Sequence, residues 1–110
     1  MKKFKDAFNG LKEALKEKSV LIQCVLGLMA IIGGLIIRLD IYEWLAFIIC
    51  IGLVISLEIA NSTIERLCDL YTNEENEKVK KIKDMSSSFV LVAAIVSLIV
   101  CIITVIRRII

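Results

Sequence analysis

Three long stretches without a charged residue constrain this chain more than any other feature of its sequence. They cover residues 19–37, 44–57 and 85–106. About 20 apolar residues in a helix are needed to cross the ~30 Å hydrocarbon core of a bilayer. The first and third stretches reach that length by themselves, whereas the second must continue past Glu58 to do so. We therefore expect three membrane-spanning helices.

The overall composition supports a membrane protein. Hydrophobic residues make up 58% of the 110 residues, and mean hydropathy is +0.83. A soluble domain of this size cannot bury so much apolar surface. Proline, which would interrupt a helix, does not occur. No small-residue cleavage site follows the first apolar stretch, so we expect that stretch to be retained rather than removed as a signal peptide.

These observations predict an all-α integral membrane protein with a single domain over residues 1–110. Apolar side chains recur at helical spacing in residues 3–18, with lysines mostly opposite. This pattern is typical of a helix that lies in the membrane interface, and a solvated helix is the alternative. The predicted spans are residues 19–37, 44–70 and 85–107, joined by a polar loop at 38–43 and a charged connection at 72–84.

The distribution of charge predicts the orientation and argues against nucleic-acid binding, and the cysteine and histidine content argues against a zinc site. Eleven lysines and arginines lie in residues 2–18 and 66–83, against three in residues 38–43 and 107–108. The positive-inside rule therefore places the amino terminus and the second connection in the cytoplasm. Nucleic-acid binding is not expected, because it needs basic residues on a shared exposed face. Four isolated cysteines and no histidine argue against a zinc site.

Acidic residues at the end of the second span form the most informative pattern. Glu58, Asn61, Glu65 and Asp69 are spaced three, four and four apart. On a helix they occupy a strip about 80° wide. Carboxylates near hydrocarbon are unfavourable unless they face protein, water or an ion, and three in a row repel one another. A divalent cation would relieve both problems. The alternative is that these are ordinary interfacial residues.

A lysine-rich segment precedes the third span. It contains Lys78, Lys80, Lys81 and the pair Lys83-Asp84. Lysines beside acidic residues suit a polyphosphate with its Mg²⁺, although an ordinary positive-inside loop has the same composition. The chain has neither a GxxxxGK[ST] motif nor a glycine-rich kinase loop. If it binds ATP, it uses neither common fold.

Together these segments resemble a known family. Residues 58–65, EIANSTIE, followed by Asp69 and then by residues 83–85, KDM, look like the signature of the prokaryotic diacylglycerol kinases, which include the undecaprenol kinases. The resemblance covers nearly the whole chain. It implies a homotrimer with active sites between subunits. It also implies ATP- and Mg²⁺-dependent phosphorylation of a lipid alcohol at the inner face of the cytoplasmic membrane.

The resemblance also assigns roles by position. Glu58 matches the general base that contacts the lipid, with Asn61 beside it. Glu65 and Glu17 match the metal-binding carboxylates, and Ser87 falls where lipid is contacted. The positions that match nucleotide contacts are Glu17, Glu65, Asp69, Glu74, Glu75, Asn76, Lys83 and Asp84.

Two positions depart from the family pattern. The first metal carboxylate usually follows a glycine by eight residues, and counting from Gly10 that position is Lys18. A one-residue deletion aligns Glu17 instead, and we expect Glu17 to be the ligand. Residues 86–88 are three serines where glycine or alanine is frequent, so close packing there is expected to differ.

The lipid substrate is the least constrained prediction. Residues 17–23, EKSVLIQ, loosely resemble the E-R-N-F-x-I-H segment of the undecaprenol branch. The tryptophan-rich surface helix of the diacylglycerol branch is missing, because Trp44 is the only tryptophan. We therefore favour undecaprenol, with diacylglycerol as the alternative. A small proton-coupled transporter is a further alternative, but such proteins usually have four spans with the acidic residue mid-span. A structural or pore-forming peptide would not need the acidic strip.

Overall fold

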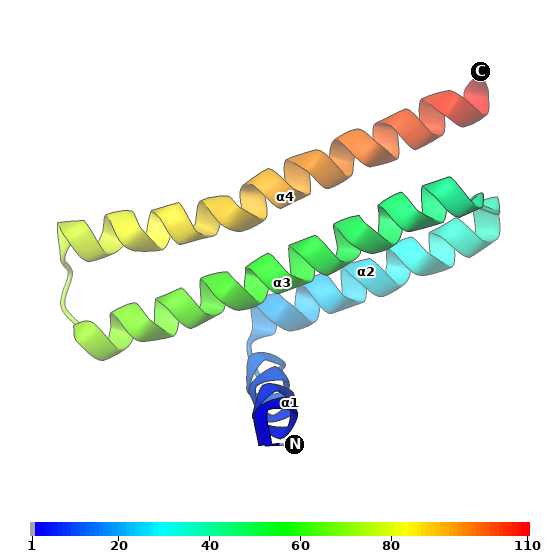
Figure 1. The fold of residues 1–110 in the computed structure, drawn as a ribbon. Coiled ribbons are helices and arrows are strands. Elements are labelled where there is room, and N and C mark those ends of the chain that lie inside the picture. Colours follow the sequence, from blue (N-terminus) through cyan, green and yellow to red (C-terminus); the bar gives the residue numbers. More distant parts are fainter. Residues whose placement is uncertain (1) are drawn as a thin grey trace.

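The computed structural model describes residues 2–110, which form four helices that follow one another along the chain (Figure 1). They are α1 (Lys2–Ala14), α2 (Lys18–Ile37), α3 (Ile41–Tyr71) and α4 (Glu77–Ile109). The last three are long and apolar enough to cross a membrane. The predicted all-α fold, with an amino-terminal helix followed by three spans, is confirmed.

Helix boundaries differ from the prediction mainly in the charged segments. The predicted surface helix ends at residue 18, but α1 ends at Ala14 and the backbone turns over residues 15–17. The predicted third span begins at residue 85, whereas α4 begins at Glu77. Within the predicted connection at 72–84, only residues 72–76 are non-helical, because the Asn76 side chain accepts the backbone N–H groups of Lys78 and Val79 at 2.9 and 3.3 Å and so caps α4. Hydropathy locates the apolar part of a helix, not its capped end.

The turn between α2 and α3 is also shorter than predicted. Arg38 ends α2 in a left-handed conformation with φ 57°. Asp40 and Glu43 then form a capping box, in which each side chain accepts the other's backbone N–H at 3.0 Å. The predicted loop at 38–43 is therefore reduced to residues 38–40, and Glu43 belongs to the first turn of α3.

α3 is the central helix of the bundle. It lies between α2 and α4 and packs along both (Figure 1), and it also contacts α1. Only four hydrophobic residues are buried in the part of the chain described, namely Val20, Leu39, Cys68 and Ala93. Most leucine and isoleucine side chains point outward, as expected for a surface that faces lipid or other subunits. The helix contacts instead bury small and polar groups, as is common between membrane helices.

Glycine permits close approach at the α2–α3 hairpin. A Cβ atom at Gly34 would lie 2.8 Å from Leu39 Cδ1 and 2.9 Å from Trp44 Cη2. A Cβ at Gly27 would lie 2.9 Å from Ile51 Cγ2. Gly33, by contrast, has nothing within 4 Å of such an atom. Gly34 and Gly27 therefore mark the face along which α2 packs on α3.

Charged residues fasten the carboxyl end of α4 to this hairpin. Arg108 donates to the Ile37 and Arg38 carbonyls at 2.9 and 2.8 Å and to Glu43 Oε1 at 2.6 Å. Arg107 lies 3.0 Å from Asp40 Oδ2. The Glu43 backbone N–H and, to a lesser extent, Arg107 hold the pKa of Asp40 below its ordinary range. These contacts join the carboxyl end of α4 to the α2–α3 turn, at the end of the bundle opposite residues 72–76.

Candidate active site

α3 carries the predicted acidic strip from the interior of the bundle to its exposed end. Glu58 and Asn61 are buried, with 6% and 8% of their surface exposed. Glu65 and Asp69 are exposed. At 1.5 Å per residue, Asp69 lies about 16 Å along the helix from Glu58, and Glu65 lies between them. The strip is therefore graded from a protected carboxylate to carboxylates that a water-soluble ligand can reach.

Glu58 differs from the other buried carboxylate in the chain. Glu43 is held by arginines, but Glu58 takes part in none of the ion pairs found among residues 2–110. A buried carboxylate without a cation is costly unless something else stabilises it. The predicted role of Glu58 as a general base stays a prediction.

A serine on α4 orients Asn61. Ser86 Oγ donates to Asn61 Oδ1 at 2.6 Å and also lies 2.9 Å from the Lys83 carbonyl, and Ser86 is only 1% exposed. Ser62 is buried beside it on α3, with its Oγ 3.4 Å from Ser19 Oγ. The sequence prediction noticed Ser86 only as a departure in packing. Its partner could not be found from sequence, because the register between two helices is a tertiary property.

Ser87 lies apart from this buried polar group. Its side chain is exposed and its Oγ lies 3.1 Å from the Lys83 carbonyl of its own helix. Among residues 2–110, no hydrogen bond joins Ser87 to Glu58. The predicted lipid contact at Ser87 therefore stays a prediction.

A polar cavity of about 620 Å³ lies where α3 ends and α4 begins. Five of the predicted nucleotide-binding residues line it: Asp69, Glu74, Glu75, Asn76 and Lys83. Four carboxylates and two lysines border the cavity, so a polyphosphate could enter it only together with cations. The polar cavity thus brings together most of the residues that were predicted to contact the nucleotide.

Two lysine–aspartate pairs lie in this region. Lys83 Nζ is 2.7 Å from Asp69 Oδ1 and joins α4 to α3 across the cavity. Asp84 lies outside the cavity lining and pairs with Lys80 at 2.9 Å on the same helix. Of the predicted pair Lys83-Asp84, the structure places only Lys83 at the cavity.

The amino-terminal carboxylates meet α3 at Arg66. Arg66 Nε donates to Glu17 Oε1 at 2.6 Å, and Arg66 Nη1 donates to Glu13 Oε2 at 3.0 Å. The Lys16 ammonium and, next, Arg66 keep the pKa of Glu13 below its ordinary range. Lys18 is exposed and makes no ion pair among residues 2–110. Of the two candidates for the first metal position, Glu17 is the one held against α3.

Carboxylates that could bind Mg²⁺ are present, but they do not form a complete set of ligands. In residues 2–110, no group of three or more histidine, cysteine, aspartate or glutamate side chains is placed to hold a metal. Mg²⁺ commonly takes one or two carboxylates and fills its other positions with phosphate oxygens and water. Glu17 is held by Arg66, the residue that follows Glu65 on α3. The assignment of Glu65 and Glu17 as metal ligands stays a prediction.

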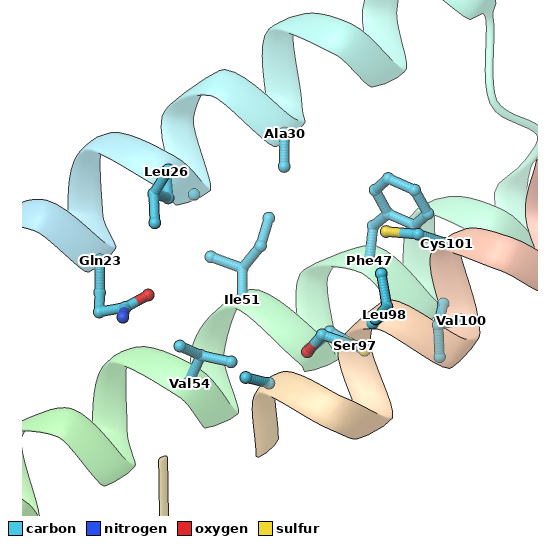
Figure 2. A pocket seen from close by; sticks show the side chains of 13 residues that line it. Gln23, Leu26, Ala30, Phe47, Ile51, Val54, Ser97, Leu98, Val100 and Cys101 are labelled. Atoms are coloured by element: carbon cyan, nitrogen blue, oxygen red, sulfur yellow. The ribbon is translucent and has the colours of Figure 1, made fainter. Parts of the chain in front are cut away.

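An apolar cavity of about 490 Å³ lies between α2, α3 and α4 (Figure 2). Leu26, Ile51 and Val54 point into it, and Gln23 and Ser97 are polar residues at its edge. Val54 is one helical turn from Glu58 on α3. Glu58 itself does not line this cavity and lies about 6 Å further along α3 than Val54.

Comparisons with known proteins identify the family of this chain. The family model for prokaryotic diacylglycerol kinase matches residues 5–105. The undecaprenol kinase of Bacillus subtilis (strain 168) is 31% identical over 100 residues, which cover 90% of this chain and 81% of that protein. The diacylglycerol kinase of Helicobacter pylori (strain J99) is 36% identical over 88 residues, which cover 79% of this chain and 69% of that protein. The chain therefore belongs to the prokaryotic diacylglycerol kinase family and is a lipid kinase.

Proposed function

We propose that this lipid kinase transfers the γ-phosphoryl group of ATP to undecaprenol, with Mg²⁺, at the cytoplasmic face of the membrane. One observation carries the chemical part of the proposal. A single helix, α3, carries three features in order. Val54 lines the apolar cavity, Glu58 follows one helical turn later, buried and without an ion pair among residues 2–110, and Asp69 lines the polar cavity near the end of the helix. A lipid hydroxyl group and a nucleotide can therefore approach the same helix from opposite directions.

Each residue of the strip has a distinct part in this reaction. Glu58 accepts the proton of the lipid hydroxyl as that oxygen forms a bond to the γ-phosphorus of ATP, and the bond from this phosphorus to the β–γ bridging oxygen breaks, so that ADP leaves. Asn61, fixed by Ser86, lies about one helical turn further along α3. The triphosphate points from the polar cavity along α3 toward Glu58 and so passes Glu65. When bound, Mg²⁺ neutralises charge on the phosphate oxygens, and Glu65 and Glu17 are the residues that would hold it.

The homotrimer with active sites between subunits that the family resemblance implies is part of this proposal, and the exposed apolar surface leaves room for contacts with other subunits as well as with lipid. Large side chains on all three spanning helices are exposed in the single chain, including Leu35, Ile49 and Val92. Glu65 is exposed too, and Mg²⁺ with a nucleotide in place is shielded from water only if another subunit covers this side. The concentration of lysine near residues 2–18 and 77–83 supports a cytoplasmic location for this side.

Undecaprenol is favoured over diacylglycerol on three grounds. The relative from Bacillus subtilis that bears the name undecaprenol kinase matches a larger share of this chain than the diacylglycerol kinase from Helicobacter pylori, although its identity is lower. Residues 17–23 also resemble the undecaprenol branch, and α1 contains no tryptophan. Only the part of a polyprenyl chain nearest its hydroxyl group would enter the apolar cavity, and the rest of the chain would lie in the bilayer.

A competition assay tests the substrate. Purified protein in mixed micelles receives labelled ATP and equal amounts of undecaprenol and diacylglycerol, and both products are quantified. We expect kcat/KM to be higher for undecaprenol. A tenfold preference for diacylglycerol, equivalent to about 1.4 kcal/mol, would overturn the substrate assignment and leave the kinase assignment intact.

A second assay tests the metal ligands. Glu65→Gln and Glu17→Gln should each raise the Mg²⁺ concentration needed for nucleotide binding, because each removes an anionic oxygen ligand. Lys18→Ala is the matched control on the neighbouring position. If Lys18→Ala strongly impairs Mg²⁺-dependent nucleotide binding and Glu17→Gln has no effect on it, the assignment of Glu17 as a metal ligand is wrong.

A further inference from the structure

Arg66 is the side chain that links α1 to the rest of the bundle. Its Nε and Nη1 atoms reach the carboxylates of Glu17 and Glu13 at 2.6 and 3.0 Å, and its Nη2 atom lies 3.5 Å from the Glu13 carbonyl oxygen. Within residues 2–110, every hydrogen bond and ion pair between α1 and another helix involves this guanidinium. One planar cation therefore spans the end of α1 and the residue that precedes α2.

The local backbone does not orient Glu17 by itself. Residues 15–17 form a turn between two helices. Glu17 occupies the N-cap position of α2 with an extended backbone, but its side chain makes no capping hydrogen bond. Neither a helical register nor a cap thus fixes the carboxylate. The contact that does fix it comes from Arg66, the residue that follows Glu65 in the sequence.

We propose that Arg66 is a positioning residue for phosphoryl transfer. It holds the Glu17 carboxylate beside the turn of α3 that carries Glu65, and it keeps α1 docked over that turn by means of Glu13. This inference rests on the proposed role of Glu17 toward Mg²⁺. The planar guanidinium suits this task because its separate N–H groups bind two carboxylates in a fixed geometry, which a lysine ammonium does not provide.

A different role for Arg66 predicts a different kinetic result. Were Arg66 only a cation that competes with Mg²⁺ for Glu17, its removal would lower the Mg²⁺ requirement and leave kcat unchanged. Were it only a surface ion pair, its removal would change little, because 46% of the side chain is exposed and such pairs stabilise proteins weakly. A positioning residue instead sets kcat, since a displacement of ~1 Å in a reacting group can cost about 100-fold in rate.

The experiment uses the full chain in lipid-containing micelles and compares wild type with Arg66→Ala, Arg66→Lys and Lys16→Ala. Lys16→Ala is the matched control, because it removes the other cation on Glu13, at 3.0 Å, without touching Glu17. We expect Arg66→Ala to lower kcat by about tenfold or more. Arg66→Lys should recover part of the loss, and Lys16→Ala should retain the wild-type kcat.

Hydrogen exchange gives a readout that does not depend on activity. In Arg66→Ala, the amides of residues 13–19 should exchange faster than in wild type, while those of residues 95–106 should not change. A kcat within twofold of wild type for Arg66→Ala, or unchanged exchange in residues 13–19, would overturn the proposal. An equal loss of kcat in Lys16→Ala would overturn it as well. If wild type phosphorylates no lipid alcohol, the proposed function fails, and the exchange data still decide whether Arg66 holds this segment.

Discussion

Replacing Glu58 with glutamine tests the chemical step most directly. The two side chains have the same shape, so the substitution opens no cavity at a site where only 6% of the residue is exposed. It breaks no ion pair either, because Glu58 has none among residues 2–110. We therefore expect the fold to persist, with a change in unfolding free energy of about 1 kcal/mol or less.

The expected effect on the rate is much larger than the effect on stability. An amide cannot accept the hydroxyl proton, and removal of a general base costs about 10²–10⁴-fold in rate. This corresponds to about 3–5 kcal/mol in the activation barrier. Nucleotide binding should remain close to that of wild type, since Asp69 and the polar cavity lie about 16 Å further along α3.

Two measurements separate chemistry from binding. Transfer of labelled phosphate to lipid in micelles gives kcat, and equilibrium binding of a nucleotide analogue with Mg²⁺ gives its Kd. Glu65→Gln is the comparison variant, because it should weaken Mg²⁺-dependent nucleotide binding as well as turnover. Near-normal turnover of Glu58→Gln would refute the assignment of the base. A loss of nucleotide binding as large as that of Glu65→Gln would show that the two ends of the strip are not separate sites.

Three further predictions concern stability. Gly34→Ala should lower the unfolding free energy by about 1–3 kcal/mol in a thermal or denaturant titration, because its Cβ lacks room, whereas Gly33→Ala should have little effect. Ser86→Ala should cost about 1–3 kcal/mol in the same titration, because it leaves a buried amide oxygen of α3 without its donor. The lowered pKa of Asp40 means that its ionised form adds stability at neutral pH that is lost below about pH 4, so wild-type Tm should fall more than that of Asp40→Asn between pH 7 and pH 3.

Much of the fold could be predicted from sequence because membrane insertion imposes a local signal. An uncharged stretch of about 20 residues identifies a span whatever its neighbours are, and the three spans were found in this way. The helical extension over residues 77–84 was missed, since charged residues form helices as readily as loops. The cap at Asn76 is the local signal that could have revealed it.

Spacing alone predicted the candidate site only where its residues lie on one helix, and the remaining site residues, such as Glu17 and Lys83, were assigned by the family resemblance. Helical spacing places Glu58, Asn61, Glu65 and Asp69 on one face without tertiary information. The contacts of Arg66 with Glu17 and of Ser86 with Asn61 join segments that are 49 and 25 residues apart. Such pairs depend on how the helices pack, so one sequence without relatives gives no evidence of them.

The length of α4 connects the nucleotide cavity to the thickness of the membrane. Its 33 residues extend about 50 Å, whereas the hydrocarbon core is about 30 Å thick. Residues 77–84 therefore form a rigid arm that projects about 12 Å beyond the uncharged segment. A change in helix tilt of about 10° displaces the end of such an arm by about 2 Å, and spanning helices tilt in response to bilayer thickness. A change in the lipid chains of the host membrane would therefore change the geometry of the cavity through the tilt of α4.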